Sequence, residues 1–440
     1  MSNNKTLQKP AFRPSFYAGT ARAEHLFLIN EYHHYVFSGK PYAKLAQEIN
    51  GEQTGDEIIS RLSATIPATR LLYAFNRLKE KGHLVEADTS TPPDWSAFWD
   101  TLNILPAEAA KRARNTSVEL RCFGNIKEDV FSDSIKNAGM TVLSQNADIC
   151  LALTDDHLQE GLDGLNREML SLSKPWMLVK PLGTVLWIGP FFVPGKTGCW
   201  ECLAQRINSN RQVENYILRS LNRKKPLETS IAVNPATISL AAGIATAELL
   251  KWTAEPSPGS GFAKITTIDV LSLDKADHRL VKRPQCPACG EEKYLHPREG
   301  GPVSLVSRAK KYTREGGHRT LSPAETYEKY KHHVSPITGV VSSLERLSEE
   351  DNSLINTYTA GHNFAMLRDN LFFLSLNLRG RSGGKGATDI QARVSGLCEA
   401  VERYSGIKPD GRKLEKGTYR SMKTRFPGRV ISPVDLMLFS

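Results

Sequence analysis

The sequence predicts a multidomain α/β protein, and three observations support this prediction. The chain has 440 residues, which is enough for two to four domains. Between about residues 95 and 299, short apolar runs alternate with helical stretches, which is typical of a mostly parallel sheet flanked by helices. Loop-forming segments at 90–94 and 300–302 separate regions of different texture. We therefore expect three domains, over residues 1–90, 91–302 and 303–440.

Composition excludes several classes of protein. The chain is 40% hydrophobic and 24% charged, so each domain can bury an ordinary core. The net charge of +10 favours acidic partners such as nucleotide phosphates or an acidic peptide. No basic block is interleaved with aromatic residues, so we expect no nucleic-acid partner. No run approaches the ~18 apolar residues of a membrane span, and the first residues are polar. We therefore expect a soluble, cytoplasmic protein with no membrane partner.

The first domain is expected to be a small sheet with helices, in a winged-helix-like arrangement. Apolar runs at residues 26–29 and 35–37 predict a hairpin, and a third strand is expected at 42–45. Thr54 and Glu57 fit a capping box, in which each side chain satisfies a free backbone N–H at a helix start. The apolar face of that helix consists of Ile58, Ile59 and Leu62. The next helix, between Pro67 and Gly82, carries Leu71, Leu72, Phe75 and Leu78 at helical spacing.

The second domain is expected to be built on a βαβ pattern. Its predicted strands are residues 118–123, 141–144, 149–153 and 265–273. Its predicted helices include residues 158–172 and a long stretch of small residues at 235–252.

Two C-x-x-C pairs predict a structural metal site. Cys199 with Cys202, and Cys286 with Cys289, have the spacing of two metal knuckles that together complete a tetrahedral four-sulfur site. Such a site has no open position, so we expect a structural zinc ion rather than a catalytic one. Four unrelated thiols or a redox pair are the alternatives. The remaining cysteines lie in apolar contexts and are expected to be buried, namely Cys122, Cys150 and Cys398.

The densest chemical signal lies in the third domain. Residues 381–388 read Arg-Ser-Gly-Gly-Lys-Gly-Ala-Thr and are expected to form a loop before a helix. On that helix one stripe is apolar and expected to be buried, consisting of Ile390, Val394, Leu397, Val401 and Tyr404. A separate stripe contains Gln391, Ser395, Glu399 and Glu402.

The two glutamates of this helix suit a hard cation. At ~100° per residue, Glu399 and Glu402 lie about 60° apart, so both carboxylates can reach one Mg²⁺ bound to phosphates. Arg403 adds a candidate phosphate or carboxylate partner. An ordinary solvated helix face with charges three residues apart is the alternative reading of the glutamates. Lys385 either contacts the phosphates or stabilises the loop.

The middle domain resembles the adenylating domain of ubiquitin-activating enzymes and of the ThiF and MoeB proteins, because a parallel sheet is combined with a four-cysteine clip. Those proteins place a glycine-rich, phosphate-binding loop after the first strand. Here the corresponding residues 122–127 contain only Gly124, with Ile126 where close approach is needed. The departure implies that the domain has lost nucleotide chemistry. Asp155 and Asp156 are either remnants of that site or the start of a helix.

The third domain resembles the YcaO family. The match consists of residues 382–388, read with one extra glycine, followed by Glu-x-x-Glu-Arg-Tyr at 399–404. In that family the glutamates bind Mg²⁺ carrying ATP, which implies this role for Glu399 and Glu402. Residues 319–326 resemble the opening of the domain. The resemblance implies a nucleotide site that includes Arg319, Thr326, Ser382, Lys385, Ser395, Glu399, Glu402 and Arg403.

The whole chain resembles the fused cyanobactin-type heterocyclases, because residues 192–203 are similar to their ThiF-like middle domain. The first domain resembles the winged-helix element that recognises a precursor peptide, on which a leader peptide adds as an extra strand. This resemblance implies docking surfaces at residues 42–45 and 67–81. The implied substrate-binding residues are Tyr42, Lys44, Arg70, Leu71, Phe75 and Arg77. Leu71 and Phe75 are equally well explained as core residues.

These resemblances imply an ATP-dependent cyclodehydratase that converts Cys, and in some cases Ser or Thr, of a ribosomal precursor peptide into azolines. A homodimer is expected. YcaO domains are much longer than residues 319–440, so the resemblance also implies that the chain holds only the first part of that domain and is inactive alone. A catalytically inactive adapter that binds the leader peptide is one alternative. An adenylating enzyme of the ubiquitin-activating type is the other.

Overall fold

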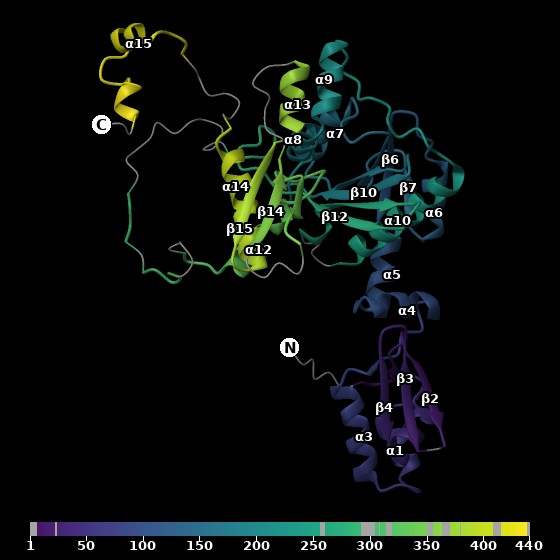
Figure 1. Ribbon diagram of the computed structural model, residues 1–440. Coiled ribbons are helices and arrows are strands. Elements are labelled where there is room, and N and C mark those ends of the chain that lie inside the picture. The colour runs from purple at the N-terminus through teal and green to yellow at the C-terminus, as the bar shows by residue number, and fades with distance from the viewer. Residues whose placement is uncertain are drawn as a thin grey trace. The chain divides into compact units, whose positions relative to one another are not determined.

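The structure is a computed structural model. It describes residues 7–22, 24–255, 260–291, 304–307, 309–313, 319–349, 355–362, 370–378, 380–407 and 415–437. The chain divides into two compact units, one formed by Met1–Trp200 with Asn222–Val281 and the other by Glu201–Leu221 with Lys282–Ser440. Figure 1 shows the elements of both units along the chain. The expected seam at residues 300–302 lies outside the described residues. Within the described residues, no helix combines the length and the apolar character needed to cross a membrane.

The N-terminal part of the first unit contains a three-stranded antiparallel sheet. Its strands are β2 (Tyr17–Ala21), β3 (His25–Ile29) and β4 (His34–Ser38), with β3 in the centre. The predicted hairpin is confirmed, because Leu26 pairs with Phe37 and Leu28 pairs with Tyr35. A separate two-stranded ladder joins β1 (Pro10–Phe12) to β5 (Leu84–Glu86).

The prediction of a strand at residues 42–45 is wrong, because this segment lies in helix α1 (Lys40–Glu48). Pro41 occupies the first turn of the helix, where its missing N–H costs nothing. Gly39, with φ of +126°, turns the chain out of β4 and into this helix. Tyr42, Ala43 and Leu45 are buried, which is a helical spacing rather than the alternation of a strand. The third strand is β2, whose small residues gave no apolar signal.

Helices α2 (Gly55–Leu62) and α3 (Ala68–Glu80) complete this part, and both were predicted. The capping box at the start of α2 is confirmed: the Glu57 backbone N–H donates to Thr54 Oγ1 at 3.2 Å, and the Thr54 N–H donates to Glu57 Oε2 at 2.8 Å. The apolar faces of both helices share one core with β3, formed among others by Leu26, Leu28, Ile58, Leu62, Leu71, Phe75 and Leu78. Each such side chain contributes about 1.5–3 kcal/mol when fully buried.

Two short helices follow the winged-helix part, namely α4 (Pro93–Thr101) and α5 (Pro106–Asn115). Arg13 connects the N-terminal segment to α4, because its Nε donates to Asp100 Oδ1 at 2.8 Å and its Nη2 donates to the Asp100 carbonyl oxygen at 2.8 Å. The Asp100 residue is buried, so this charged contact is well shielded from water.

The rest of the first unit is built on a seven-stranded sheet of order β12-β11-β10-β9-β8-β6-β7. The strands are β6 (Ser117–Phe123), β7 (Thr141–Leu143), β8 (Ile149–Thr154), β9 (Trp176–Lys180), β10 (Val185–Phe192), β11 (Lys264–Asp269) and β12 (Lys275–Arg279). Strands β7, β6, β8 and β9 are parallel, and β10 to β12 are antiparallel. The sheet is therefore mixed, since the short connections after β9 and β11 permit only hairpins.

Helices α6 (Asp129–Asn137), α7 (Leu162–Ser171) and α10 (Pro235–Ala254) belong to this sheet domain. The long helix of small residues was predicted, and Ala241, Ala242 and Ala245 are buried in the core together with strand residues. Small side chains let α10 come close to α6, where Ser134 Oγ and Thr246 Oγ1 are 2.8 Å apart.

The second unit contains a three-stranded antiparallel sheet of order β13-β14-β15, where β13 is Ser343–Arg346, β14 is Asn356–Gly361 and β15 is Arg381–Gly386. The long helix α14 (Asp389–Ser405) packs against β14 and β15. Other helices among the described residues of this unit are α8 (Trp200–Asn210), α9 (Gln212–Ser220), α12 (Pro323–Tyr330), α13 (Leu371–Leu378) and α15 (Tyr419–Arg425).

The glycine-rich segment is a strand rather than the expected loop. Its glycines are explained by the closeness of α14: a Cβ atom on Gly384 would lie 2.0 Å from the Ala392 carbonyl oxygen, and one on Gly386 would lie 2.6 Å from the Ala392 nitrogen. Side chains alternate along a strand, so only the residues facing α14 need to be small. These two glycines therefore bring the strand and the helix into contact.

The buried stripe of α14 also differs from the prediction. Its buried residues are Ala392, Gly396, Leu397 and Ala400. Of the predicted stripe, Leu397 is buried and Val401 and Tyr404 are packed against its core, whereas Ile390 and Val394 are only partly buried. Hydrophobic spacing alone missed this face because the close approach of β15 selects small residues over large ones.

Candidate functional site

Helix α14 presents a polar face that carries the predicted carboxylates. Ser395, Cys398, Glu399 and Glu402 are spaced three and four residues apart, so they share this face over two helical turns. Ser395, Cys398 and Glu402 are exposed and Glu399 is half-buried. The structure thus places Glu399 and Glu402 on the same side of the helix. The arrangement can hold a hard cation between adjacent turns.

Arg403 is the observed partner of one glutamate. Its Nη2 lies 2.9 Å from Glu399 Oε1, and its Nε donates to the same oxygen at 3.1 Å. The Arg403 side chain is 55% exposed, and pairs of this kind contribute less than about 1 kcal/mol. A divalent cation could therefore displace the guanidinium from Glu399 at little cost.

His362, which directly follows β14, is a further residue of this site that the sequence pattern did not predict. His362 is buried, and the charges of Arg403 and Glu399 both act on its ring. Burial lowers the pKa of His362, and Arg403 lowers this pKa further. The imidazole is therefore held neutral near the first glutamate at neutral pH. Nothing in the sequence around residue 362 indicated this proximity, because it depends on strand β14 lying beside α14.

The two predicted nucleotide-site residues that precede the glycine-rich strand, Arg319 and Thr326, lie in different local structures. The Arg319 backbone pairs with Tyr312, with both N–H···O distances at 3.0 Å. Burial raises the pKa of the Cys398 thiol, while the positive charge of Arg319 acts to lower it, so Arg319 lies near the polar face of α14. Thr326 lies on α12 and donates its hydroxyl to the Ser322 carbonyl oxygen at 2.9 Å. Helix α12 packs against α14. The structure therefore brings Arg319 toward Cys398, one turn before Glu402 on the same helix.

Ser382 and Lys385 lie on opposite faces of β15. Ser382 pairs with Ala360, and its hydroxyl is buried without a hydrogen-bond partner in the described part of the chain. Lys385 pairs with Thr357 and is exposed. Because side chains alternate along a strand, Lys385 points away from the α14 side, on which Ser382 lies. This geometry favours the alternative in which Lys385 does not contact the same phosphates as α14.

A polar network fixes the start of α14. The Tyr358 hydroxyl donates to Asp389 Oδ1 at 2.6 Å, and Arg393 Nη2 donates to the same hydroxyl at 2.9 Å. Arg393 also lies 3.0 Å from Asp389 Oδ2. The Thr388 side chain and Gln391 form a capping box. Together these contacts hold the helix in one orientation on the sheet.

The four predicted cysteine ligands come together. Their sulfur atoms all lie within 4.8 Å of one another, and Cys202 Sγ is 3.5 Å from Cys289 Sγ. Cys199, Cys202 and Cys286 are buried and Cys289 is partly buried. The backbone N–H of Arg283 donates to Cys202 Sγ at 3.4 Å. Elsewhere, Cys150 is buried as expected, but Cys122 and Cys398 are exposed.

The surroundings of this cluster fit a metal-bound thiolate group. Arg206 is only 9% exposed, and the Nε atom of Arg283 is buried without a hydrogen-bond partner among the described residues. Two shielded guanidinium groups beside neutral thiols would leave their charge uncompensated. Four thiolates on one divalent ion carry two net negative charges, which offset these cations. Four sulfur ligands in a closed set are typical of zinc.

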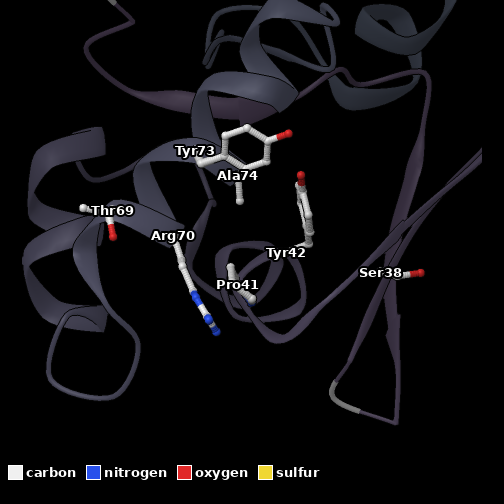
Figure 2. A pocket seen from close by; sticks show the side chains of 7 residues that line it. All are labelled: Ser38, Pro41, Tyr42, Thr69, Arg70, Tyr73 and Ala74. Carbon is white, nitrogen blue, oxygen red and sulfur yellow. The ribbon is translucent and has the colours of Figure 1, made fainter.

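A pocket lies in the winged-helix part, between the end of β4, α1 and α3. Figure 2 shows its lining residues, and its volume is about 320 Å³. The residues that line it are Ser38, Pro41, Tyr42, Thr69, Arg70, Tyr73 and Ala74. The Tyr73 side chain is 63% exposed at the opening. This pocket is open, partly apolar and bordered by a positive charge, which suits a side chain of an extended peptide.

The predicted docking residues divide into two groups. Tyr42 and Arg70 line the pocket, and Arg77 is next to it, because its Nη1 donates to the Tyr73 hydroxyl at 3.2 Å. Leu71 is fully buried and Phe75 is 8% exposed, so the structure favours the core alternative for both. The remaining residue, Lys44, is exposed on α1 and contacts Gln47.

Strand β4 leaves a free edge beside the pocket. It is the terminal strand of its described sheet and pairs only with β3 there. An edge strand presents unpaired backbone N–H and C=O groups that another chain can pair with. Ser38 at the end of β4 is also a pocket residue. The edge and the pocket thus form one continuous surface.

The Asp155 side chain occupies the loop after β6. Gly124 has φ of +99°, and a Cβ atom there would lie 2.0 Å from Asp155 Oδ2. The backbone N–H of Asn125 points at the same carboxylate, at 3.4 Å. A phosphate at this loop would meet a like charge. The arrangement supports the expectation that this domain has lost nucleotide binding.

Two families match parts of the chain. Residues 11–86 match a winged helix-turn-helix domain family. Residues 383–440 match the YcaO cyclodehydratase family, described as ATP- and Mg²⁺-binding. The second match contains the whole of α14 with both glutamates. No curated protein matches the chain at a significant level.

Two solved structures are similar to nearly the whole chain. A heterocyclase in complex with substrate and cofactor is 36% identical, with a TM-score of 0.81, over 94% of this chain and 56% of that one. The heterocyclase TruD is 30% identical, with a TM-score of 0.71, over 94% of this chain and 54% of that one. The chain therefore spans about half the length of these relatives. A segment of this mixed α/β chain matches the YcaO cyclodehydratase family, and nearly all of the chain is similar to the solved heterocyclases.

Proposed function

We propose that this chain is part of an ATP-dependent cyclodehydratase that converts Cys side chains of a ribosomal precursor peptide into azolines. One observation supports this most strongly. The segment that matches the YcaO family contains α14, whose polar face carries Glu399 and Glu402 beside Arg319 and His362. The similarity to heterocyclases over 94% of the chain supports the same reaction class. Ser and Thr are further possible substrates of the same chemistry.

The proposed reaction removes one water from the peptide for each ring. The Cys sulfur attacks the carbonyl carbon of the preceding residue, forming a C–S bond and releasing the thiol proton. When bound, MgATP supplies the phosphoryl group that makes the former carbonyl oxygen a leaving group. Phosphate then departs, the amide N–H proton is lost, and a C=N bond closes the azoline. ATP is converted to ADP and phosphate.

The residues of α14 would hold the cofactor for this reaction. Glu399 and Glu402 would bind Mg²⁺, with Arg403 released from Glu399 to face the phosphates. Arg319 would add a second positive charge near the same helix face. Neutral His362 beside Glu399 would leave the carboxylate charged and available to the cation. A hard cation and oxygen ligands agree with the chemistry of this donor set.

The winged-helix part would dock the precursor peptide. A leader segment adding to the edge of β4 would gain backbone hydrogen bonds, and a side chain of that segment would enter the neighbouring pocket. Arg70 and Arg77 favour an acidic leader. The edge of β4 is proposed as the docking strand in place of residues 42–45, because those residues are helical. A homodimer and a cytoplasmic location remain predictions.

A second candidate function is a non-catalytic adapter that docks the leader peptide. It is favoured by the pocket and the free edge of β4, which can bind a peptide without any contribution from α14. An adenylating enzyme is disfavoured, because Asp155 occupies the loop where phosphate would bind.

A two-part experiment tests the proposal. A labelled leader peptide is titrated onto the chain, and a full precursor with MgATP is then followed by mass spectrometry and phosphate release. Ring formation appears as the loss of one water per ring and should be abolished in Glu399→Gln. Leader binding with no turnover would instead support the adapter. ATP–pyrophosphate exchange that survives Glu399→Gln but not a change at Gly124 would support adenylation.

A further inference from the structure

One face of α8 contacts three different parts of the second unit. Cys202, Arg206 and Asn210 are four residues apart in succession, so they lie on consecutive turns of the same face. Cys202 belongs to the four-cysteine cluster. Arg206 contacts α14, which carries the proposed nucleotide site, and Asn210 contacts the turn before Val340.

Arg206 links the helix to the end of α14. Its guanidinium carbon lies 4.9 Å from the centre of the Tyr404 ring, which is the distance of a cation–π contact. Tyr404 is two residues after Glu402. Arg206 is 9% exposed, and its Nη1 atom is buried with no hydrogen-bond partner in the described part of the chain.

Arg206 keeps its positive charge in this buried position, so neighbouring groups must stabilise that charge. Burial lowers the pKa of Arg206, and the nearby charge of Arg283 lowers it too, while Tyr404 and the Cys202 sulfur act in the opposite direction. A buried cation next to a second cation is costly unless negative charge lies close by. Thiolates held on a divalent ion provide that charge, whereas four protonated thiols do not.

Asn210 links the same helix face to the core of the second unit. Its Nδ2 donates to the carbonyl oxygens of Ile337 and Gly339, at 3.1 and 3.0 Å. The turn between them continues into Val340 and Val341, which share a core with Leu397 and Ala400 of α14. Helix α8 is thus connected to α14 both through Tyr404 and through this core.

We propose that α8 couples the four-cysteine metal centre to α14, with Arg206 as the positioning residue that fixes the end of α14 and thereby the location of Glu402. The metal-bound thiolates stabilise the Arg206 guanidinium, and the stacked guanidinium holds Tyr404. This inference rests on the proposed function only where it concerns MgATP. The coupling itself concerns residues of this chain and is measurable without turnover.

Hydrogen–deuterium exchange of α14 is the direct test. In the zinc-loaded wild-type chain, amides of residues 397–405 should exchange slowly, and removal of zinc by a chelator should speed them about tenfold. Arg206→Met, shown to retain zinc by metal analysis, should already exchange fast, and chelation should add little. Arg420→Met removes an exposed guanidinium on α15 and serves as the matched control that behaves as wild type. Exchange in α3 should not change in any sample.

Substitutions at the stacked pair separate stacking from folding. Arg206→Lys keeps the charge but not the planar group, so it should restore only part of the protection. Tyr404→Phe should retain protection, and Tyr404→Leu should lose it. Arg206→Met combined with Tyr404→Leu should be no worse than either change alone. Zinc-loaded Arg206→Met with wild-type exchange in α14 would overturn the proposal, as would additive losses in the double variant.

Nucleotide titration adds a functional readout. Arg206→Met should weaken MgATP binding about tenfold. If zinc strengthens MgATP binding through Arg206, then by linkage MgATP should strengthen zinc binding to the wild-type chain by a similar factor, measured by competition with a chelator. MgATP affinity that is unchanged in Arg206→Met counts against the coupling. A wild-type chain that binds no MgATP counts against the proposed function instead, and the exchange measurements still decide the coupling.

Discussion

At the scale of single residues, the two glutamates of α14 carry the proposed cofactor chemistry. Glu402 is exposed and Glu399 is half-buried, so changing them should affect binding more than folding. This separation gives the most direct test of the nucleotide site.

Glu399→Gln and Glu402→Gln should each weaken MgATP binding about tenfold or more, because each removes a charged oxygen ligand. The melting temperature should change little, since the Glu399–Arg403 pair is largely exposed. Equilibrium titration with a fluorescent nucleotide measures the affinity. Glu415→Gln, which removes another exposed, arginine-paired carboxylate of the same unit, is the control. Equal affinities in all three variants would contradict the assignment.

Gly384 is a residue whose role only the packing reveals. Gly384→Ala should destabilise the second unit by about 1–3 kcal/mol, because the new methyl group would clash with the Ala392 backbone. Gly383→Ala is the matched control, because nothing lies within 4 Å of a Cβ atom there. Denaturant unfolding of both variants provides the measurement. A Gly384→Ala chain as stable as the control would show that β15 and α14 do not pack this closely.

At the scale of elements, β4 and α3 together form the proposed peptide surface. The edge of β4 supplies backbone groups, and α3 supplies Arg70 and Tyr73 at the pocket. The surface therefore depends on two elements that are 30 residues apart in the chain.

Arg70→Ala should weaken binding of an acidic leader peptide about fivefold at low salt, and the difference should shrink as salt is raised. Fluorescence anisotropy at two ionic strengths measures both effects. Lys111→Ala on α5, which removes an exposed positive charge outside the pocket, should bind as wild type. An identical loss in both variants would point to net charge rather than the pocket.

His83, in the turn before β5, makes the winged-helix part sensitive to acid. Its ring packs against Tyr35 and Phe37, at 4.6 and 5.3 Å between ring centres, and burial lowers the pKa of His83 below its usual value near 6.5. The unfolded chain then binds a proton more readily than the folded one, so stability should fall as pH drops from above 6.5 toward the lowered pKa.

The measurement is thermal unfolding between pH 7.5 and about 5. His83→Phe should lose part of this pH dependence, and the remainder is expected from His278 and His362, whose pKa values are also lowered by burial. The same pH dependence in the variant and in the wild type would remove His83 from this role.

At the scale of the whole molecule, the cysteine cluster joins segments that are far apart in sequence. Cys202 and Cys286 belong to the same unit although 84 positions separate them. Closing such a long loop restricts the unfolded chain strongly, so metal binding is also folding free energy.

Cys286→Ser should lower the zinc content and reduce the melting temperature of the second unit by roughly 5 °C or more. Cys122→Ser, which changes an exposed cysteine outside the cluster, should leave both quantities unchanged. Metal analysis and calorimetry together provide the measurement. Full zinc content in Cys286→Ser would show that this cysteine is not a ligand.

The sequence by itself determined the features that depend on local chemistry and spacing. These are the capping box at Thr54, the parallel strands β6, β7 and β8, the long helix of small residues, the two cysteine knuckles and the polar stripe of α14. Each follows from groups a few residues apart, whose relation is fixed by the geometry of one helix, strand or turn.

Only the tertiary structure decided the features that depend on what packs against a segment. Residues 42–45 are helical, with Tyr42 and Leu45 buried in the core shared with β3 and α3. The glycine-rich segment is a strand that lies against α14. Tertiary contacts within the second unit also bring His362 near Glu399 and Arg319 near Cys398. They place Arg206 over the Tyr404 ring, on the same helix as Cys202. Spacing along the chain carries no information about such neighbours, since they are set by elements that meet only after folding.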